Sequence, residues 1–260
     1  MKIEIVGAGN VGFNLGVHLK NSGHTITRVI SRSQKSAACL AGMTDSEWST
    51  GLNGVGRNCD LVILSVNDDA LPEVVKGIGN QDCIVVHTSG SMNMEPLMAF
   101  THYGVFYPVQ TFTRNHIVGF EGIPVCIEAN ERNTELILTG LAQSIKAAAY
   151  MVDSEQRAWL HIAAVFACNF TTHLYGIAEK ILEKNDMSRD LIMKLIAETA
   201  AKYGNMPVSE AQTGPAKRND RNILKKHMDL LSSTPELHDL YRLFSERINL
   251  VYNKKCNGKF

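Results

Sequence analysis

The sequence predicts an α/β protein, with a doubly wound, mostly parallel sheet over residues 1–152 and a smaller all-α domain over residues 153–260. Up to about residue 152, short runs of β-branched residues alternate with segments of helical periodicity, as in a parallel sheet covered by helices. After Asp153, glycines and β-branched runs become rare, and apolar residues recur at steps of three and four. We therefore expect two domains joined near Asp153.

The first domain contains seven expected strands. Residues 61–64 and 84–86 are continuous apolar runs, which are typical of strands buried on both faces of a sheet, so we expect them at its centre. The seven strands are predicted at residues 2–6, 26–31, 61–66, 83–87, 104–107, 124–128 and 148–152. Helices are expected to fill most of the gaps.

The second domain begins with one long predicted helix. Its apolar face is formed by Ile162, Phe166, Phe170, Leu174, Ile177 and Ile181. Asp153 or Ser154 is expected to cap it, because a short side-chain oxygen can accept an unpaired N–H of the first turn. Further helices are predicted at residues 188–203, 208–213, 219–231 and 235–252, with a Gly-Pro loop at residues 213–220.

Composition excludes several classes of protein. The 26 Lys and Arg residues balance the 26 Asp and Glu residues, and no run of like charges suggests a nucleic-acid partner. The six cysteines form no C-x-x-C pair, so neither a metal site nor a disulfide framework is expected, and reduced thiols indicate a cytoplasmic protein. No apolar stretch approaches 18 residues and no export signal is recognisable, so we expect no membrane association.

A glycine-rich turn directly follows the first predicted strand and opens a segment of helical periodicity. This placement is what a GxGxxG turn needs to bind the diphosphate of a dinucleotide in a Rossmann domain. The helix N-terminus adds free N–H groups and about half a positive charge. The predicted cofactor-binding residues are Gly7, Ala8, Gly9, Asn10, Val11 and Gly12. The alternative is a purely structural glycine turn.

The residues after the second strand indicate which dinucleotide binds. An NAD-specific domain places a carboxylate there, on the ribose 2′-hydroxyl. This chain has Ser31, Arg32 and Ser33 instead, which offer hydroxyl donors and a guanidinium for a 2′-phosphate. We therefore expect NADP in preference to NAD. Alternatively, Arg32 is a solvated loop residue and Ser31 a helix cap.

Two more polar loops follow predicted strands at the edge where ligands of open α/β sheets bind. Ser65, Val66 and Asn67 are expected to contact the cofactor. The next residues, Asp68 and Asp69, either bind a ligand or cap the following helix.

The loop after the fourth predicted strand is rich in short donors. Thr88 and Ser89 are predicted to bind the cofactor and Ser91 to bind a substrate. His87 is predicted either to act at the reacting centre or to satisfy its ring nitrogens on neighbouring backbone.

Together these segments resemble a family of Rossmann-like proteins, provisionally assigned as NADP oxidoreductases, whose C-terminal half is a helical domain of unknown function. The resemblance covers essentially the whole chain. It extends more distantly to pyrroline-5-carboxylate reductase, deazaflavin-dependent NADP reductases and β-hydroxyacid dehydrogenases. It implies a homodimer whose helical domain lies against the Rossmann cleft. The matching segments are residues 7–12, 31–33, 65–71, 87–91, 104–112, 161–169 and 213–220.

The β-hydroxyacid dehydrogenases carry a catalytic lysine and, four residues later, an asparagine on the corresponding helix. Asn169 matches the asparagine, but Val165 stands in place of the lysine, so their mechanism cannot be carried over. On a regular α-helix His161 lies about 12 Å and about 80° from Asn169. One small substrate is therefore not expected to touch both.

Three residues of the second domain are candidates for the reaction. His161 is a possible general acid or base, or a packing residue. Asn169 interrupts an apolar run and either binds substrate or cofactor or makes an interhelical hydrogen bond. Arg218 either binds an anionic substrate or the facing protomer, or is solvated while Asp220 caps the next helix.

The sequence thus predicts an NADP-dependent oxidoreductase that transfers a hydride between the nicotinamide and a small carbonyl or imine substrate, with Asn169, His161 and His87 as catalytic candidates. The alternative is a non-catalytic NADP-binding sensor or interaction protein, which the missing lysine favours. A purely structural dimerisation module is a third possibility.

Overall fold

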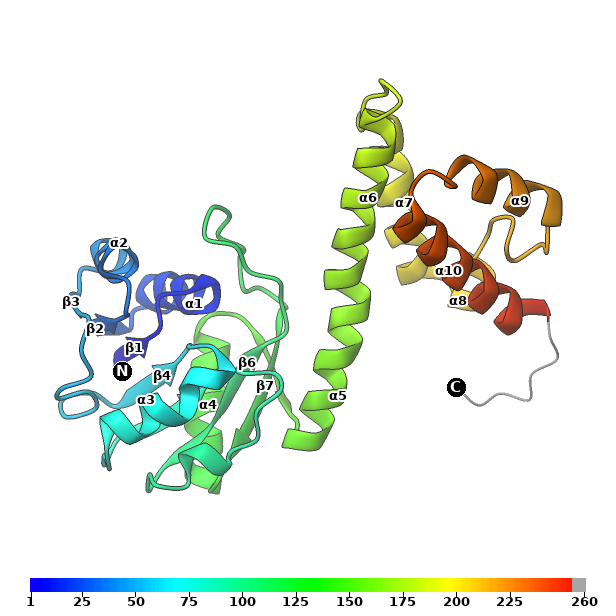
Figure 1. The fold of residues 1–260 in the computed structure, drawn as a ribbon. Coiled ribbons are helices and arrows are strands. Elements are labelled where there is room, and N and C mark those ends of the chain that lie inside the picture. Colours follow the sequence, from blue (N-terminus) through cyan, green and yellow to red (C-terminus); the bar gives the residue numbers. More distant parts are fainter. Residues whose placement is uncertain (254–260) are drawn as a thin grey trace. The chain divides into compact units, whose positions relative to one another are not determined.

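The computed structural model describes residues 1–253, and the chain divides into two compact units, Met1–Leu174 and Tyr175–Phe260. The first unit holds a sheet with its covering helices and the start of a long helix, and the second is helical (Figure 1).

The first unit is built on one eight-stranded sheet. Its order is β3-β2-β1-β4-β5-β6-β7-β8, and all neighbouring strands are parallel except the antiparallel pair β6–β7. The strands are β1 (Lys2–Val6), β2 (Thr25–Ile30), β3 (Glu47–Ser49), β4 (Leu61–Leu64), β5 (Ile84–His87), β6 (Tyr103–Pro108), β7 (Pro124–Ala129) and β8 (Ala148–Met151). This confirms the predicted Rossmann-like fold class, in which the strand order reverses between β1 and β4.

The sequence missed one strand, β3. It has three residues, lies at the edge of the sheet, and none of the three is buried. So short and exposed a strand has no apolar run that could reveal it.

Helices cover both faces of the sheet. The helices are α1 (Asn10–Asn21), α2 (Gln34–Thr44), α3 (Leu71–Ile78) and α4 (Arg132–Ser144), with 3₁₀ turns η1 (Asp68–Ala70) and η2 (Glu95–Leu97). In β4, Leu61 and Ile63 pack into one apolar core with α1, α2 and α4, whereas Val62 and Leu64 pack into another with α3. Because successive strand residues face opposite sides, a continuous apolar run stabilises both cores.

The long predicted helix is present but not regular. It consists of α5 (Ser154–Ala164), the π-helical segment η3 (Val165–Phe170) and α6 (Thr171–Glu183). Asp153 caps it as expected, since its side chain accepts the Gln156 N–H at 2.8 Å in a capping box.

The second unit contains α7 (Asp190–Asn205), α8 (Val208–Ala211), α9 (Arg221–Leu230) and α10 (Pro235–Asn253). The predicted loop separates α8 from α9. In the described part of this unit only Ala216 is buried.

Two further observations concern residues 1–253. No helix in this range combines the length and the apolar character that crossing a membrane requires. Within the same range, no three His, Cys, Asp or Glu side chains are grouped so as to hold a metal ion.

Candidate functional site

The glycine turn connects β1 to α1 in a conformation that requires glycine. Gly7 has φ +104°, and a Cβ atom there would overlap the Ser65 carbonyl oxygen. A Cβ at Gly12 would overlap the Gly7 carbonyl, so helix α1 starts directly against the turn. At Gly9 the space is open, which leaves the backbone accessible to a ligand.

The N-terminus of α1 is available to an anion. Gly9 occupies the N-cap position without a side-chain cap, and the first turn contains no acidic residue. The first N–H groups of a helix have no intrahelical partner and carry partial positive charge. Asn10 and Val11 therefore present N–H groups where a diphosphate would lie.

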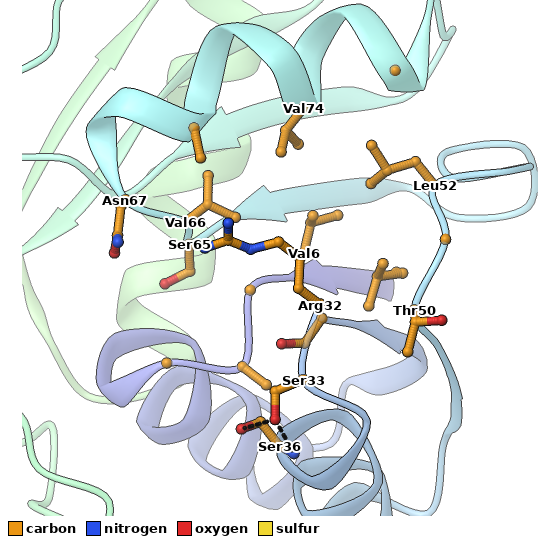
Figure 2. A pocket seen from close by; sticks show the side chains of 18 of the residues that line it. Val6, Arg32, Ser33, Ser36, Thr50, Leu52, Ser65, Val66, Asn67 and Val74 are labelled. Atoms are coloured by element: carbon orange, nitrogen blue, oxygen red, sulfur yellow. Dashed lines mark hydrogen bonds between the residues drawn. The ribbon is translucent and has the colours of Figure 1, made fainter.

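A first cavity, of about 790 Å³, opens beside this turn. It is lined by the segments that follow β1, β2, β3 and β4, by α3 and by Arg114, and Figure 2 shows most of its side chains. Of the predicted cofactor-binding residues, it brings together Gly7, Ala8, Gly9, Ser31, Arg32, Ser33, Ser65, Val66 and Asn67.

Hydroxyl groups and an arginine surround the end of β2. The helix cap lies at Ser33 rather than Ser31, because the Ser33 hydroxyl accepts the Ser36 N–H at 3.3 Å. Arg32 extends into the first cavity (Figure 2). The one carboxylate in the lining, Glu73, comes from α3 and not from β2.

A second cavity, of about 850 Å³, adjoins the first. The two share Gly9, Ser65, Val66 and Asn67 in their linings. The second cavity also brings together predicted residues from three other places, namely Asn10, Val11, Thr88, Ser89, Ser91, His161 and Asn169.

Both His161 and Asn169 line the second cavity, together with Val165. A regular helix would turn the two side chains about 80° apart. Residues Val165–Phe170 are π-helical, however, and i→i+5 bonding changes the rotation per residue. The two side chains line the same cavity, and the expectation that one small ligand does not touch both stays a prediction.

Tyr107 is a site residue that the sequence analysis did not single out. Its hydroxyl lies 3.1 Å from Nδ1 of His161, and burial raises the pKa of Tyr107. Gly90 packs beneath the pair so closely that a Cβ there would overlap both rings. Only its place near the end of β6, beside the predicted site, could have identified Tyr107.

His87 is buried and its ring nitrogens are engaged. Nδ1 accepts the Ser89 N–H at 3.1 Å, and Nε2 lies 3.1 Å from the Asn93 carbonyl oxygen, to which it donates. Burial, and next the positive charge of Arg157, lower its pKa to about 4. Neutral His87 thus holds the loop that carries Ser89, and it lines neither cavity.

Arg157 anchors α5 to the sheet. Its fully buried guanidinium donates to Oε2 of Glu128 at 2.5 Å, to the Met92 carbonyl at 2.6 Å and to the Ser154 hydroxyl at 3.1 Å. This contact fixes the helix one turn before His161. It therefore sets the wall of the second cavity.

The remaining predicted residues behave differently. Asp68 and Asp69 line the second cavity, in a 3₁₀ turn without a side-chain cap. Arg218 lies in the second unit, where its exposed guanidinium is 3.8 Å from Asp220. Asp220 occupies the N-cap position of α9 without making a side-chain cap bond.

The fold and the glycine turn define a dinucleotide-binding Rossmann-type protein with a helical C-terminal part. Family models agree: the Rossmann-like domain matches residues 1–110, and a domain of unknown function, DUF2520, matches residues 123–248. No curated protein matches the sequence. The BF3122 protein of Bacteroides fragilis, provisionally assigned as an NADP oxidoreductase, is 39% identical over 95% of this chain and 97% of its own, with a TM-score of 0.91. The chain belongs to this family of Rossmann-like proteins with a DUF2520 domain.

More distant structures share the fold. A reductive aminase from Aspergillus terreus, in complex with NADPH and ethyl-5-oxohexanoate, is 12% identical over 100% of this chain and 96% of its own, with a TM-score of 0.73. 1-Pyrroline-5-carboxylate reductase from Streptococcus pyogenes is 12% identical over 96% and 98%, with a TM-score of 0.65.

Proposed function

We propose that the protein is an NADP-dependent oxidoreductase that transfers a hydride between the nicotinamide and a small carbonyl or imine substrate. One observation carries this proposal: a cavity suited to a nucleotide adjoins a polar cavity, and Gly9, Ser65, Val66 and Asn67 belong to both. A dinucleotide laid along the glycine turn would thus reach from one cavity into the other.

The first cavity is proposed to bind the adenosine half of the cofactor. The backbone from Gly7 to Gly12 would hold the diphosphate, and Ser31, Arg32 and Ser33 the 2′-phosphate. NADP is favoured over NAD because the end of β2 offers hydroxyls and a guanidinium without a carboxylate. When bound, the nicotinamide supplies or accepts the hydride.

The second cavity is proposed to bind the substrate. Tyr107 is held by His161 at 3.1 Å, so its hydroxyl is placed to donate a proton to the oxygen or nitrogen that hydride transfer makes basic. His161, which takes up a proton from solvent, would then return one to the Tyr107 phenolate oxygen through Nδ1. Asn169 lines the same cavity and would orient the substrate with its amide. In this proposal Tyr107 is the proton donor, so the lysine that Val165 replaces is not required.

Further substrate contacts are proposed for the loop after β5. Ser91 would offer its hydroxyl to the substrate in the second cavity, where Thr88 and Ser89 would contact the cofactor. His87 is proposed to position this loop rather than exchange protons, because both of its nitrogens are engaged. Residues 153–260 are proposed to form the substrate and dimerisation domain. Within this domain, Arg218 is proposed to contact the substrate.

The similar proteins support this chemistry. The B. fragilis relative carries a provisional NADP oxidoreductase assignment, and the A. terreus aminase binds NADPH together with a keto ester. Both proteins are in line with a nicotinamide cofactor, and the compound bound to the aminase is a small carbonyl compound.

We also propose a cytoplasmic homodimer. The apolar side chains of α5 to α10 are largely exposed, and Arg157 and Ala216 are the only buried residues among residues 154–253. Exposed apolar surface on this scale is typical of an oligomer interface. The free cysteines of the described residues, Cys39, Cys59, Cys83, Cys126 and Cys168, support a reducing compartment.

Oxidation of NADPH in the presence of ketoacids, aldehydes and cyclic imines tests the activity. We expect at least one substrate class to be reduced, and Asn169→Ala, His161→Ala and Tyr107→Phe to lower kcat by about 100-fold. The variants are expected to keep most of their NADPH affinity, because none of the three residues lines the first cavity, which is proposed to hold the adenosine half of the cofactor. Tight NADPH binding without oxidation of any compound would favour a non-catalytic sensor instead.

A further inference from the structure

The segment between β6 and β7, residues 109–123, is held firmly against α1. The amide of Asn14, a fully buried residue of α1, donates to the Thr113 carbonyl at 3.2 Å and accepts the Val118 N–H at 3.3 Å. Phe112 and Phe120 are also buried, with their rings stacked 5.4 Å apart. The backbone on both sides of residue 114 is therefore fixed.

Arg114 stands at the turn that these contacts create. Its guanidinium donates to the Ala8 carbonyl, in the glycine turn, and to the Ser36 hydroxyl at 3.0 Å, in the first turn of α2. These two elements flank the first cavity, and Arg114 belongs to its lining. Arg114 thus bridges the glycine turn and the end of β2.

The charges of the first cavity are unbalanced without a ligand. Its lining contains two guanidinium groups, Arg32 and Arg114, and one carboxylate, Glu73. An arginine has five N–H donors, and Arg114 directs only two of them to protein oxygens among the described residues. The remaining donors suit an anion, because arginine binds phosphate through two parallel N–H groups.

From this arrangement we infer that Arg114 binds the 2′-phosphate of NADP together with Arg32, and so determines the preference for NADP over NAD. The inference rests on the proposed cofactor site. Ser36, one partner of Arg114, is bonded to Ser33 at the end of β2, where the ribose 2′ position of a dinucleotide lies in this fold. The 2′-phosphate would take the place of the Ser36 hydroxyl as acceptor.

The proposed 2′-phosphate site therefore includes the segment between β6 and β7 as well as the glycine turn and the residues after β2. The segment after β2 supplies Arg32, but Arg114 comes from a segment just over eighty residues further along the chain, where no local pattern marks a phosphate contact. The preference for NADP would then depend on the buried Asn14 that holds the segment.

Equilibrium titrations of the full-length protein with NADPH and NADH, followed by nicotinamide fluorescence, test the inference. In Arg114→Ala we expect NADPH affinity to fall about tenfold or more and NADH affinity to change by less than about threefold. Arg114→Lys should retain part of the preference, because it keeps the charge but not the fork. Adenosine 2′,5′-bisphosphate, which lacks the nicotinamide, should lose affinity for Arg114→Ala as NADPH does.

Arg132→Ala is the matched control, since Arg132 is an exposed arginine of the same unit paired with Glu135 outside both cavities. It should bind both cofactors like the wild type, and unfolding midpoints should verify that all variants fold. If Arg114→Ala keeps the wild-type ratio of NADPH to NADH affinity, or weakens both equally, the inference is overturned while the proposed function stands. If the wild type binds neither cofactor, both fall.

Discussion

The α/β part of the chain and the helical part that follows it bury their apolar residues very differently. Strands such as β4 are completely buried, and their side chains join two continuous cores. In α7, by contrast, Leu191 and Leu195 are 70% and 64% exposed. The α/β part therefore buries most of its own apolar residues, whereas the helical part leaves many of its apolar residues exposed.

The same difference applies to the two cavities, because the residues proposed to bind the cofactor and those proposed to bind the substrate come from different parts of the chain. The residues proposed to bind the cofactor, Gly7, Arg32 and Arg114, all belong to the α/β part. His161 and Asn169 come from the long helix, which is joined to the sheet by the buried Arg157. Cofactor binding should thus be robust, while the substrate wall depends on a few contacts.

The largest effect is expected from cutting that anchor. Arg157→Ala leaves Glu128 without its buried partner, and we expect the free energy of unfolding to fall by about 3 to 5 kcal/mol. Chemical denaturation measures it. Arg189→Ala removes an arginine that is 59% exposed and paired with Glu179, and should cost less than about 1 kcal/mol. Equal losses in the two variants would show that Arg157 does not anchor the helix.

The second largest effect is expected from acid, which should lower the free energy of unfolding through His87 in the loop beside the second cavity. His87 has a pKa of about 4 when folded and 6.5 when unfolded, so between these values only the unfolded chain binds the proton. The contribution of neutral His87 to the free energy of unfolding is fully present above about pH 6.5 and is lost as the pH falls towards 4. The loss is of the order of 3 kcal/mol.

Denaturation at several pH values, compared between the wild type and His87→Gln, checks this dependence. The variant should lose most of the slope between pH 6.5 and 4. The matched control is His102→Gln, because His102 is partly exposed and lies 2.6 Å from Glu131. A slope that survives in His87→Gln would assign the acid sensitivity to other groups.

The smallest effect on the α/β part is expected from changing the helical face. Leu191→Asp combined with Leu195→Asp should convert a dimer to a monomer, since burying the charges at an interface is unfavourable. Light scattering gives the mass, and the unfolding free energy of the α/β part should shift by less than about 0.5 kcal/mol. A wild-type mass of one chain at micromolar concentration would contradict the proposed dimer.

The sequence predicted what local patterns determine. The glycine turn was recognisable because its three glycines lie close together between one strand and the next helix, where Gly12 packs against the Gly7 carbonyl. The buried strands were recognisable from their apolar runs, and Asp153 from its place before a helix. In each case the sequence pattern lies within a few residues of the turn, strand or helix end that it predicts.

The rest depends on contacts between distant segments. Tyr107 becomes part of the site through His161, 54 residues later, and Arg114 through Ala8, 106 residues earlier. The π-helical segment that interrupts the long helix at Val165–Phe170 has no apolar period of its own. Such features follow from tertiary packing, so a single sequence gave no signal for them.

The central claim is that the first cavity binds NADP through the glycine turn and the end of β2. Equilibrium titration of the wild-type protein with NADPH and NADH, at one ionic strength, tests it most directly. The account predicts saturable binding of both, with NADPH tighter by about tenfold or more, as expected for a charge-assisted phosphate contact. No saturable binding of either nucleotide, or a preference for NADH, would contradict it.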